Sequence, residues 1–103
     1  MDKKEVIDKV KRYAAVIKAY FPVKMVILFG SYARGNPREA SDIDVAVVVD
    51  EISDDCLESE ARLNRLRRSI DLRIEPVLIE KDEKDPEGFL EEILKTGEII
   101  YQV

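Results

Sequence analysis

The chain has 103 residues, a length that fits one domain (residues 1–103) with a modest hydrophobic core. Hydrophobic residues make up 46% and charged residues 38%, which is typical of a folded chain and excludes intrinsic disorder. With 17 basic and 22 acidic residues, the net charge of −5 makes nucleic acid an unlikely partner, because binding to nucleic acid depends on positive charge.

The sequence carries no sign of export or membrane insertion. No apolar run approaches the roughly 20 residues that span a bilayer, and residues 1–5 lack the apolar core of a signal peptide. The single cysteine, Cys56, cannot form an internal disulfide, which favours a reducing compartment. We therefore expect a cytoplasmic protein without a membrane span, with Cys56 buried in a helix.

The first two elements follow from the spacing of apolar residues. These residues recur every three or four positions over residues 3–20, which predicts an amphipathic helix capped by Asp2 and ended by Pro22. Residues 23–29 form a nearly continuous apolar run, as expected of a strand buried on both faces. Gly30 ends this strand.

A short helix over residues 31–34 and a turn-rich loop over residues 35–38 are expected next. Residues 42–49 then form a second strand, whose alternation separates two sets of side chains. One face carries Asp42, Asp44 and Ala46, and the other carries Ile43, Val45 and Val47.

The second half continues the alternation of helices and strands. Residues 53–55 resemble a helix cap, and the helix after them is expected to reach about Arg68 and to pack through leucines and Ala61. Residues 70–79 are predicted to form a third strand, which Pro76 marks as an edge strand or a bend. In the helix that follows residues 53–55, the residues expected to pack against the core are Leu57, Ala61, Leu63 and Leu66.

The last helix is expected to begin at Asp85 and Pro86, to face the core with Leu90, Ile93 and Leu94, and to end at Gly97. Residues 98–101 add a short apolar strand. The order α-β-α-β-α-β-α predicts an α/β (α+β) domain of two layers around a small sheet.

The turn after the first strand has the chemistry of a phosphate site. Gly30 has no side chain to block close approach, and Ser31 offers a hydroxyl and a backbone N–H at a helix N-terminus, where an anion is favoured. Arg34 is placed to meet a triphosphate. The structural alternatives are an ordinary serine-capped turn and a solvated arginine.

Asp42 and Asp44 have the spacing of metal ligands. Two carboxylates two residues apart on a strand point the same way, about 7 Å apart, and repel each other when unpaired. Magnesium suits such a pair, because it accepts one or two carboxylates together with phosphates and waters. The alternative is that Asp42 caps the strand and Asp44 is exposed, although Asp44 lies inside an apolar run.

A third carboxylate would complete a site for two metal ions. Asp71 and Glu75 are both eligible, because alternation in the predicted third strand places them on the same face as Arg73. The alternative for each is a surface charge paired with Arg73.

These residues resemble a known family. Gly30-Ser31 and, after ten residues, Asp42-Ile43-Asp44 are similar to the signature of the DNA polymerase beta-type nucleotidyltransferase superfamily. The compact length resembles its minimal members, the MNT domains, and the likeness covers about residues 20–80. Ile70-Asp71-Leu72-Arg73-Ile74 also resembles the strand that carries the third catalytic aspartate, which favours Asp71 over Glu75. The resemblance implies a mixed sheet flanked by helices.

The resemblance also implies roles for these residues in a nucleotidyltransferase. Gly30 and Ser31 would hold the β- and γ-phosphates of ATP, and Asp42 and Asp44 would bind two Mg²⁺ ions. Asp71 would bind the catalytic ion and help to deprotonate the acceptor hydroxyl, which attacks the α-phosphorus and releases pyrophosphate.

MNT proteins are often paired with a HEPN-domain protein. In the toxin–antitoxin version, the MNT member adds AMP to a tyrosine of the HEPN toxin, and this small acidic chain is consistent with that role. The alternatives are a non-catalytic module that binds a nucleotide or a partner, and nucleotidyl transfer to a small molecule or RNA. Apolar helix faces at residues 6–20 and 89–100 could also serve a homo-oligomer.

Overall fold

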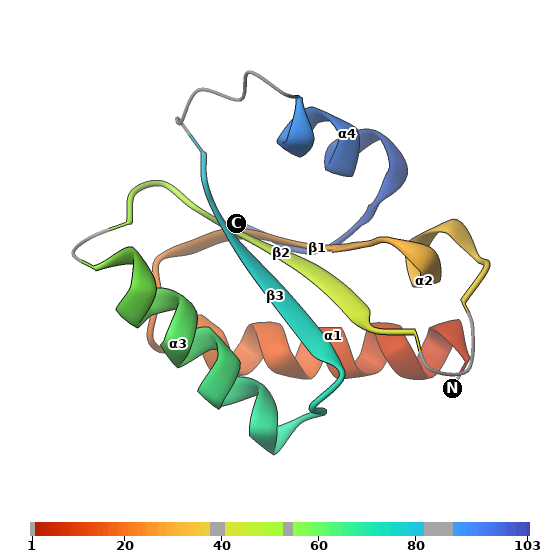
Figure 1. Ribbon diagram of the computed structural model, residues 1–103, viewed down its shortest axis with the longest axis horizontal. Coiled ribbons are helices and arrows are strands. Elements are labelled where there is room, and N and C mark those ends of the chain that lie inside the picture. Colours follow the sequence, from red (N-terminus) through yellow and green to blue (C-terminus); the bar gives the residue numbers. More distant parts are fainter. Residues whose placement is uncertain (1, 38–40, 53–54, 82–87) are drawn as a thin grey trace.

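The computed structural model describes residues 2–37, 41–52, 55–81 and 88–103 (Figure 1). The elements in chain order are α1 (Lys3–Ile17), β1 (Val23–Phe29), α2 (Ser31–Arg34), β2 (Ile43–Val49), α3 (Cys56–Leu66), the 3-10 helix η1 (Arg67–Ser69), β3 (Ile74–Glu80), α4 (Phe89–Thr96) and β4 (Glu98–Gln102). In the described part of the chain, no helix has the length and apolar character needed to cross a membrane.

The four strands form one mixed sheet in the order β3-β2-β1-β4. β1 runs antiparallel to both β2 and β4, whereas β2 and β3 are parallel. This arrangement confirms the predicted α+β fold with a mixed sheet. β3 lies at one edge, which explains why Pro76, which has no N–H to donate, is tolerated inside it.

Helices cover the sheet on both faces (Figure 1). On the face of α1 and α3, strand residues such as Val45 and Val47 join a large buried cluster that includes Leu63 of α3. On the opposite face, Ala46 and Val48 pack in a smaller cluster with Ile93 of α4. The predicted alternation of β2 is therefore confirmed, and it assigns Asp44 to the face covered by α4.

The first helix is shorter than predicted, although its cap is as expected. The Asp2 side chain accepts a hydrogen bond from the backbone N–H of Glu5 at 2.8 Å. α1 ends at Ile17, and Tyr20 lies in a turn with 58% of its surface exposed. The reason is Pro22, which disfavours helical backbone at the residue before it and so forces the chain to leave the helix early.

Some predicted core positions are wrong. Leu57 and Leu94 are exposed, at 76% and 42%, and Cys56 is exposed at the first position of α3. Asp55 caps α3 by accepting from the N–H of Leu57 at 3.0 Å. The predicted caps at residues 53–54 and 85–86 lie outside the described residues.

The third strand begins four residues later than predicted. The N–H of Asp71 donates to the carbonyl of Arg67 at 2.9 Å, and the N–H of Ile74 donates to the carbonyl of Asp71 at 3.2 Å. These bonds continue the turn that follows η1. Asp71 therefore lies in a turn before β3 and not on the strand.

Candidate functional site

The Gly30 turn fits closely against Asp44. Gly30 has φ 76° and ψ −153°, a backbone conformation that glycine adopts without steric cost, and α2 begins at the next residue. A Cβ atom added to Gly30 would overlap the carboxylate of Asp44. Glycine is therefore required here both for the bend of the chain and for the space that the Asp44 side chain fills.

Strand pairing brings the two sequence motifs together. The last residue of β1, Phe29, is paired with Asp44 near the start of β2. The chain therefore turns through Gly30 and Ser31 beside the point where Asp42 leads into β2. Ser31 and Asp44 are half-buried, and Asp42 is exposed. Both predicted motifs thus lie at one end of the sheet.

Glu75 is the third carboxylate on this face. In the parallel pairing of β2 with β3, Asp44 lies opposite Glu75. Neighbouring strands lie about 4.8 Å apart, and paired residues present their side chains on the same face. We call Asp42, Asp44 and Glu75 the acidic cluster.

The electrostatics of Asp44 reflect this cluster. Burial raises the pKa of Asp44, and the negative charges of Asp42 and Glu75 raise it further. The positive charge of Arg34 in α2 opposes them and lowers the pKa of Asp44. Arg34 is thus the cation that the structure places within electrostatic range of Asp44.

Asp71, predicted as the third catalytic carboxylate, lies elsewhere. Its Oδ2 accepts a hydrogen bond from Nζ of Lys9 in α1 at 2.7 Å, and its Oδ1 accepts one from the backbone N–H of Arg73 at 2.8 Å. Burial raises the pKa of Asp71, but these hydrogen bonds and the charges of Lys9 and Arg73 lower it on balance. Asp71 therefore holds the turn before β3 against α1, on the other side of the sheet from Asp44.

A pattern in the sequence could have identified Glu75. Ile43 and Ile74 are paired, both are fully buried, and each is followed at once by a carboxylate. β2 and β3 are parallel, so their first residues lie at the same end of the sheet. An acidic residue that directly follows the first buried residue of each strand therefore lies beside its counterpart. The preference for Asp71 instead followed the resemblance of residues 70–74 to a strand that carries a catalytic aspartate, yet Leu72 is 64% exposed in the turn before β3.

The acidic cluster is an open arrangement. Across the described ranges, no three acidic, histidine or cysteine side chains are close enough together to form a complete metal site. Carboxylate oxygens are nevertheless the ligands that Mg²⁺ prefers, and Mg²⁺ normally keeps waters and substrate phosphates as its remaining ligands. The mutual repulsion of the carboxylates around Asp44 also fits a bound cation. The donor set is therefore suitable for magnesium shared with a substrate.

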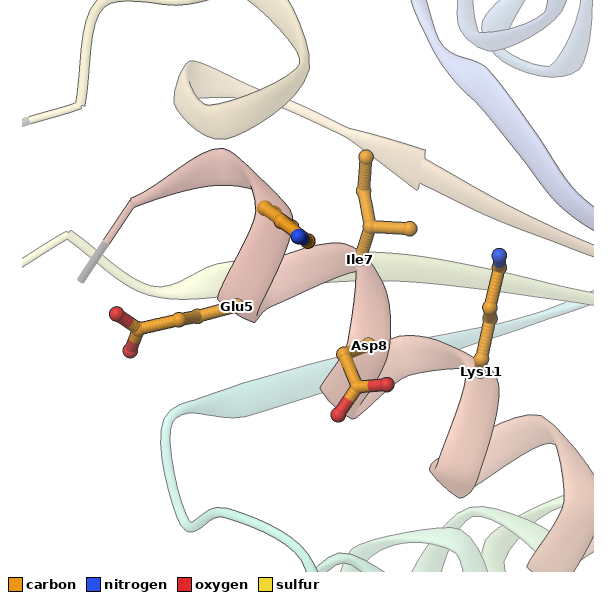
Figure 2. A pocket seen from close by; sticks show the side chains of 5 residues that line it. Glu5, Ile7, Asp8 and Lys11 are labelled. Atoms are coloured by element: carbon orange, nitrogen blue, oxygen red, sulfur yellow. The ribbon is translucent and has the colours of Figure 1, made fainter.

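A surface cavity of about 340 Å³ lies apart from this cluster. It is lined by Lys4, Glu5, Ile7, Asp8 and Lys11. All five residues belong to α1, which packs on the face of the sheet opposite Asp44. Figure 2 shows Ile7 and Lys11 pointing to one side of the helix while Glu5 and Asp8 point to others. This cavity is not part of the acidic cluster.

The chain is similar in sequence to known proteins. The family model described as "Polymerase beta, Nucleotidyltransferase" matches residues 11–103. The relative named "Putative protein adenylyltransferase MJ0141", from Methanocaldococcus jannaschii, is 32% identical over 99 residues, which cover 90% of this chain and 96% of that protein. "Putative protein adenylyltransferase MJ1379" of the same organism is 43% identical over 47 residues, and in this match the chain spans about half the length of the relative (47%) and 46% of its own.

Solved structures share the fold. The "putative nucleotidyltransferase from Sulfolobus solfataricus" has a TM-score of 0.70 and 20% identity, over 97% of this chain and 83% of that one. The crystal structure described as "the toxin-antitoxin with AMP-PNP" has a TM-score of 0.63 and 18% identity, over 100% of this chain and 75% of that one. At these identities the likeness concerns the fold alone.

Proposed function

The chain belongs to the polymerase beta-type nucleotidyltransferase family, as an enzyme of its minimal MNT type, and we propose that it transfers AMP from ATP to a hydroxyl group of a partner protein. The observation that carries this proposal is the convergence of the acidic cluster on the Gly30–Ser31 turn. The same end of the sheet thus offers donors for phosphate and ligands for magnesium.

Each residue of the site has a role in this reaction. The Ser31 hydroxyl and the first backbone N–H groups of α2 would donate hydrogen bonds to the terminal phosphates, and the Arg34 guanidinium would offset their charge. Asp42, Asp44 and Glu75 would hold the metal ions. When bound, magnesium would supply charge neutralisation on the triphosphate and a lower pKa for the attacking hydroxyl.

Glu75 is also placed to accept the acceptor's proton. Its Oε1 lies 3.6 Å from Nη1 of Arg67, and its side chain is 52% exposed, so an approaching hydroxyl group can reach it from solvent. The acceptor oxygen forms a bond to the α-phosphorus, the bond from that phosphorus to the bridging oxygen breaks, and pyrophosphate leaves. The chain contributes positioning and charge stabilisation in this transfer.

The comparisons support adenylyl transfer to a protein. The two relatives from Methanocaldococcus jannaschii carry the name "putative protein adenylyltransferase", and similar folds occur in a toxin–antitoxin with AMP-PNP and in a mutant of the toxin–antitoxin MntA-HpeT. We therefore propose ATP as donor, two Mg²⁺ ions as cofactors and a tyrosine of a HEPN-domain toxin as acceptor. The chain would act as the antitoxin in the cytoplasm, where ATP is abundant.

The test is transfer of label from ATP labelled at the α-phosphate. The protein is incubated with Mg²⁺, this ATP and a partner co-purified from its own cells, and we expect label on a partner tyrosine. Asp44→Asn should abolish the labelling, whereas Leu94→Ala, an exposed change on α4, should not.

Other outcomes would replace this proposal. Tight ATP binding without transfer to any acceptor would indicate a non-catalytic binding module. Label on RNA or on a metabolite, with none on the partner, would indicate a different acceptor class. Labelling that persists in Asp44→Asn would exclude the acidic cluster as the catalytic centre.

A further inference from the structure

An aromatic side chain borders the acidic cluster. Phe29 is the β1 residue paired with Asp44, and directly opposite residues of antiparallel strands point to the same face with their Cβ atoms about 5 Å apart. Glu75 flanks Asp44 on the other side. Glu75, Asp44 and Phe29 therefore form a line across three strands, with the carboxylates at one end and a ring at the other.

A second ring extends this border away from the sheet. Phe89, the first residue of α4, meets Phe29 edge to face, with ring centroids 6.1 Å apart and an angle of 90° between the rings. Phe29 is half-buried, but Phe89 is 46% exposed. We call Phe29 and Phe89 the aromatic wall. Its inner ring is fixed against the sheet, and its outer ring presents apolar surface to solvent.

Few described side chains offer such a surface. Among the large hydrophobic residues that are exposed in the described part of the chain, only Tyr20 and Phe89 are aromatic. Tyr20 follows the C-terminal end of α1, which Figure 1 places at the opposite end of the sheet from α2. Phe89 is thus the exposed ring on the side of the phosphate turn.

We propose that the aromatic wall is the nucleobase subsite, with the base of the bound nucleotide stacked on Phe89. The inference rests on the proposed function, because the triphosphate must lie at Gly30 and Ser31 for its base to reach the wall. Every base has a π face, and stacking on an aromatic side chain strengthens binding by tenfold or more per base, on the order of magnitude found by alanine substitution. A phenyl ring has no hydrogen-bonding group, so this platform favours large purines through contact area.

The test compares ATP with inorganic tripolyphosphate, each with Mg²⁺, by calorimetric titration. Phe89→Leu keeps apolar volume against Phe29 but removes the aromatic face. We expect it to weaken ATP binding about tenfold and to leave tripolyphosphate binding unchanged. Phe89→Tyr should bind ATP like the wild type. Leu94→Ala, on the same helix and 42% exposed, is the matched control and should change neither affinity.

A second readout reports contact directly. The chain contains no tryptophan, so Phe89→Trp would carry a single indole at the wall. Its fluorescence should change when ATP binds and should stay constant when tripolyphosphate binds. Leu94→Trp places the same probe on α4 away from the wall and should respond to neither ligand.

The outcomes separate this inference from the proposed function. If the wild type binds both ligands and Phe89→Leu changes neither affinity, the nucleobase subsite is overturned and the proposed function stands. An unchanged ATP affinity with reduced transfer to the acceptor would also overturn it, because the wall would then contact the acceptor. If the folded wild type binds neither ligand, the proposed function fails and the subsite fails with it.

Discussion

At the scale of single residues, the position of the Asp44 side chain depends on the absence of a side chain at Gly30. The Asp44 carboxylate fills the space that a side chain at position 30 would need, and the pKa of Asp44 is raised because its charge is half-buried beside Asp42 and Glu75. A charge kept in such surroundings reduces stability unless a partner offsets it. This cost is consistent with a functional position, since active sites concentrate groups whose pKa values are shifted in this way.

Gly30→Ala should therefore harm both folding and activity. The added methyl group would occupy a backbone conformation with φ 76° and would displace the Asp44 carboxylate. Gly35→Ala is the matched control, because Gly35 has φ 79° but no atom within 4 Å of an added Cβ. Gly30→Ala should lose about 1–3 kcal/mol of unfolding free energy from backbone strain, because φ 76° and ψ −153° lie in a region that essentially only glycine adopts. Gly35→Ala, with the left-handed helical φ 79° and ψ 17°, should lose about 1–2 kcal/mol. The clash with Asp44 should add a further loss of unfolding free energy in Gly30→Ala alone, and this variant alone should lose the transfer activity. Urea unfolding and the labelling assay measure the two effects, and equal behaviour of the variants would contradict the predicted clash.

Substitutions at Glu75 and Asp71 decide which carboxylate completes the site. Glu75→Gln should lower the rate of transfer by a factor on the order of 10² to 10⁴, the usual contribution of a catalytic acid or base, with little change in stability. Asp71→Asn should lower stability and leave transfer nearly unchanged, because its oxygens bond to Lys9 and to the Arg73 backbone. Transfer rates of the two variants, measured at saturating ATP, check this prediction. The reverse pattern would restore Asp71 to the catalytic role that the sequence favoured.

The stabilising effect of Asp71 should depend on pH. Its pKa is lowered from the ordinary value of 3.8, so the folded protein favours the ionised carboxylate more than the unfolded chain does. The stabilisation is then present above the unfolded pKa and is lost as the pH falls through the folded pKa. The wild type should be more stable than Asp71→Asn at pH 7, and the difference should shrink below about pH 4. Urea unfolding at a series of pH values measures it, and a constant difference would argue against the ion pair.

At the scale of elements, α4 is held by few contacts, yet it carries the outer ring of the aromatic wall. Ile93 is its only buried residue among those described. The end of the helix comes very close to β1, because a Cβ added to Gly97 would lie 2.8 Å from the Leu28 carbonyl oxygen and 2.6 Å from the Ile93 carbonyl oxygen. The position of Phe89 therefore depends on a small contact area around Ile93.

Ile93→Ala should loosen this helix. Removing a fully packed isoleucine costs about 2–5 kcal/mol, through lost burial and the cavity that remains. Leu94→Ala, at the next position but 42% exposed, should cost far less. Urea unfolding measures both variants, and hydrogen exchange of the α4 amides reports local opening. Similar losses for the two variants would show that α4 does not dock through Ile93.

The precision of the sequence predictions also varied by element. The β1 strand, with bounds at Val23 and Phe29, was predicted at its full length, because a compact apolar run between Pro22 and Gly30 leaves little alternative. The start of β3 was misplaced, because residues 70–73 have the alternation of a strand but form hydrogen bonds back to Arg67. The local sequence pattern does not distinguish a strand from a turn here, because the turn is also held by the contact of Asp71 with Lys9, which lies in a distant segment.

At the scale of the whole molecule, nucleotide and metal should stabilise the fold. A net charge of −5 and the raised pKa of Asp44 both disfavour the folded chain when no cation is bound. Ligands that bind only the folded state add stability, about 2.7 kcal/mol at a concentration of 100 times Kd.

ATP with Mg²⁺ should therefore raise the thermal midpoint of the wild type, and chelation of the metal should reverse most of the rise. Asp44→Asn should gain little from the same ligands, although without metal it should be at least as stable as the wild type, because the buried charge is gone. Differential scanning calorimetry measures these shifts. An equal rise in the variant would show that the ligands bind away from the acidic cluster.

The amino-acid sequence by itself determined the local features of this protein: the Gly30–Ser31 turn, the paired aspartates at the start of a buried strand, and the alternation of helices and strands. These follow from short-range sterics, periodicity and charge. Only the tertiary structure decided that Glu75 stands beside Asp44, that Asp71 is bound to Lys9, and that Phe89 meets Phe29. Those placements depend on strand register and helix docking, which are set by packing between segments far apart in the chain.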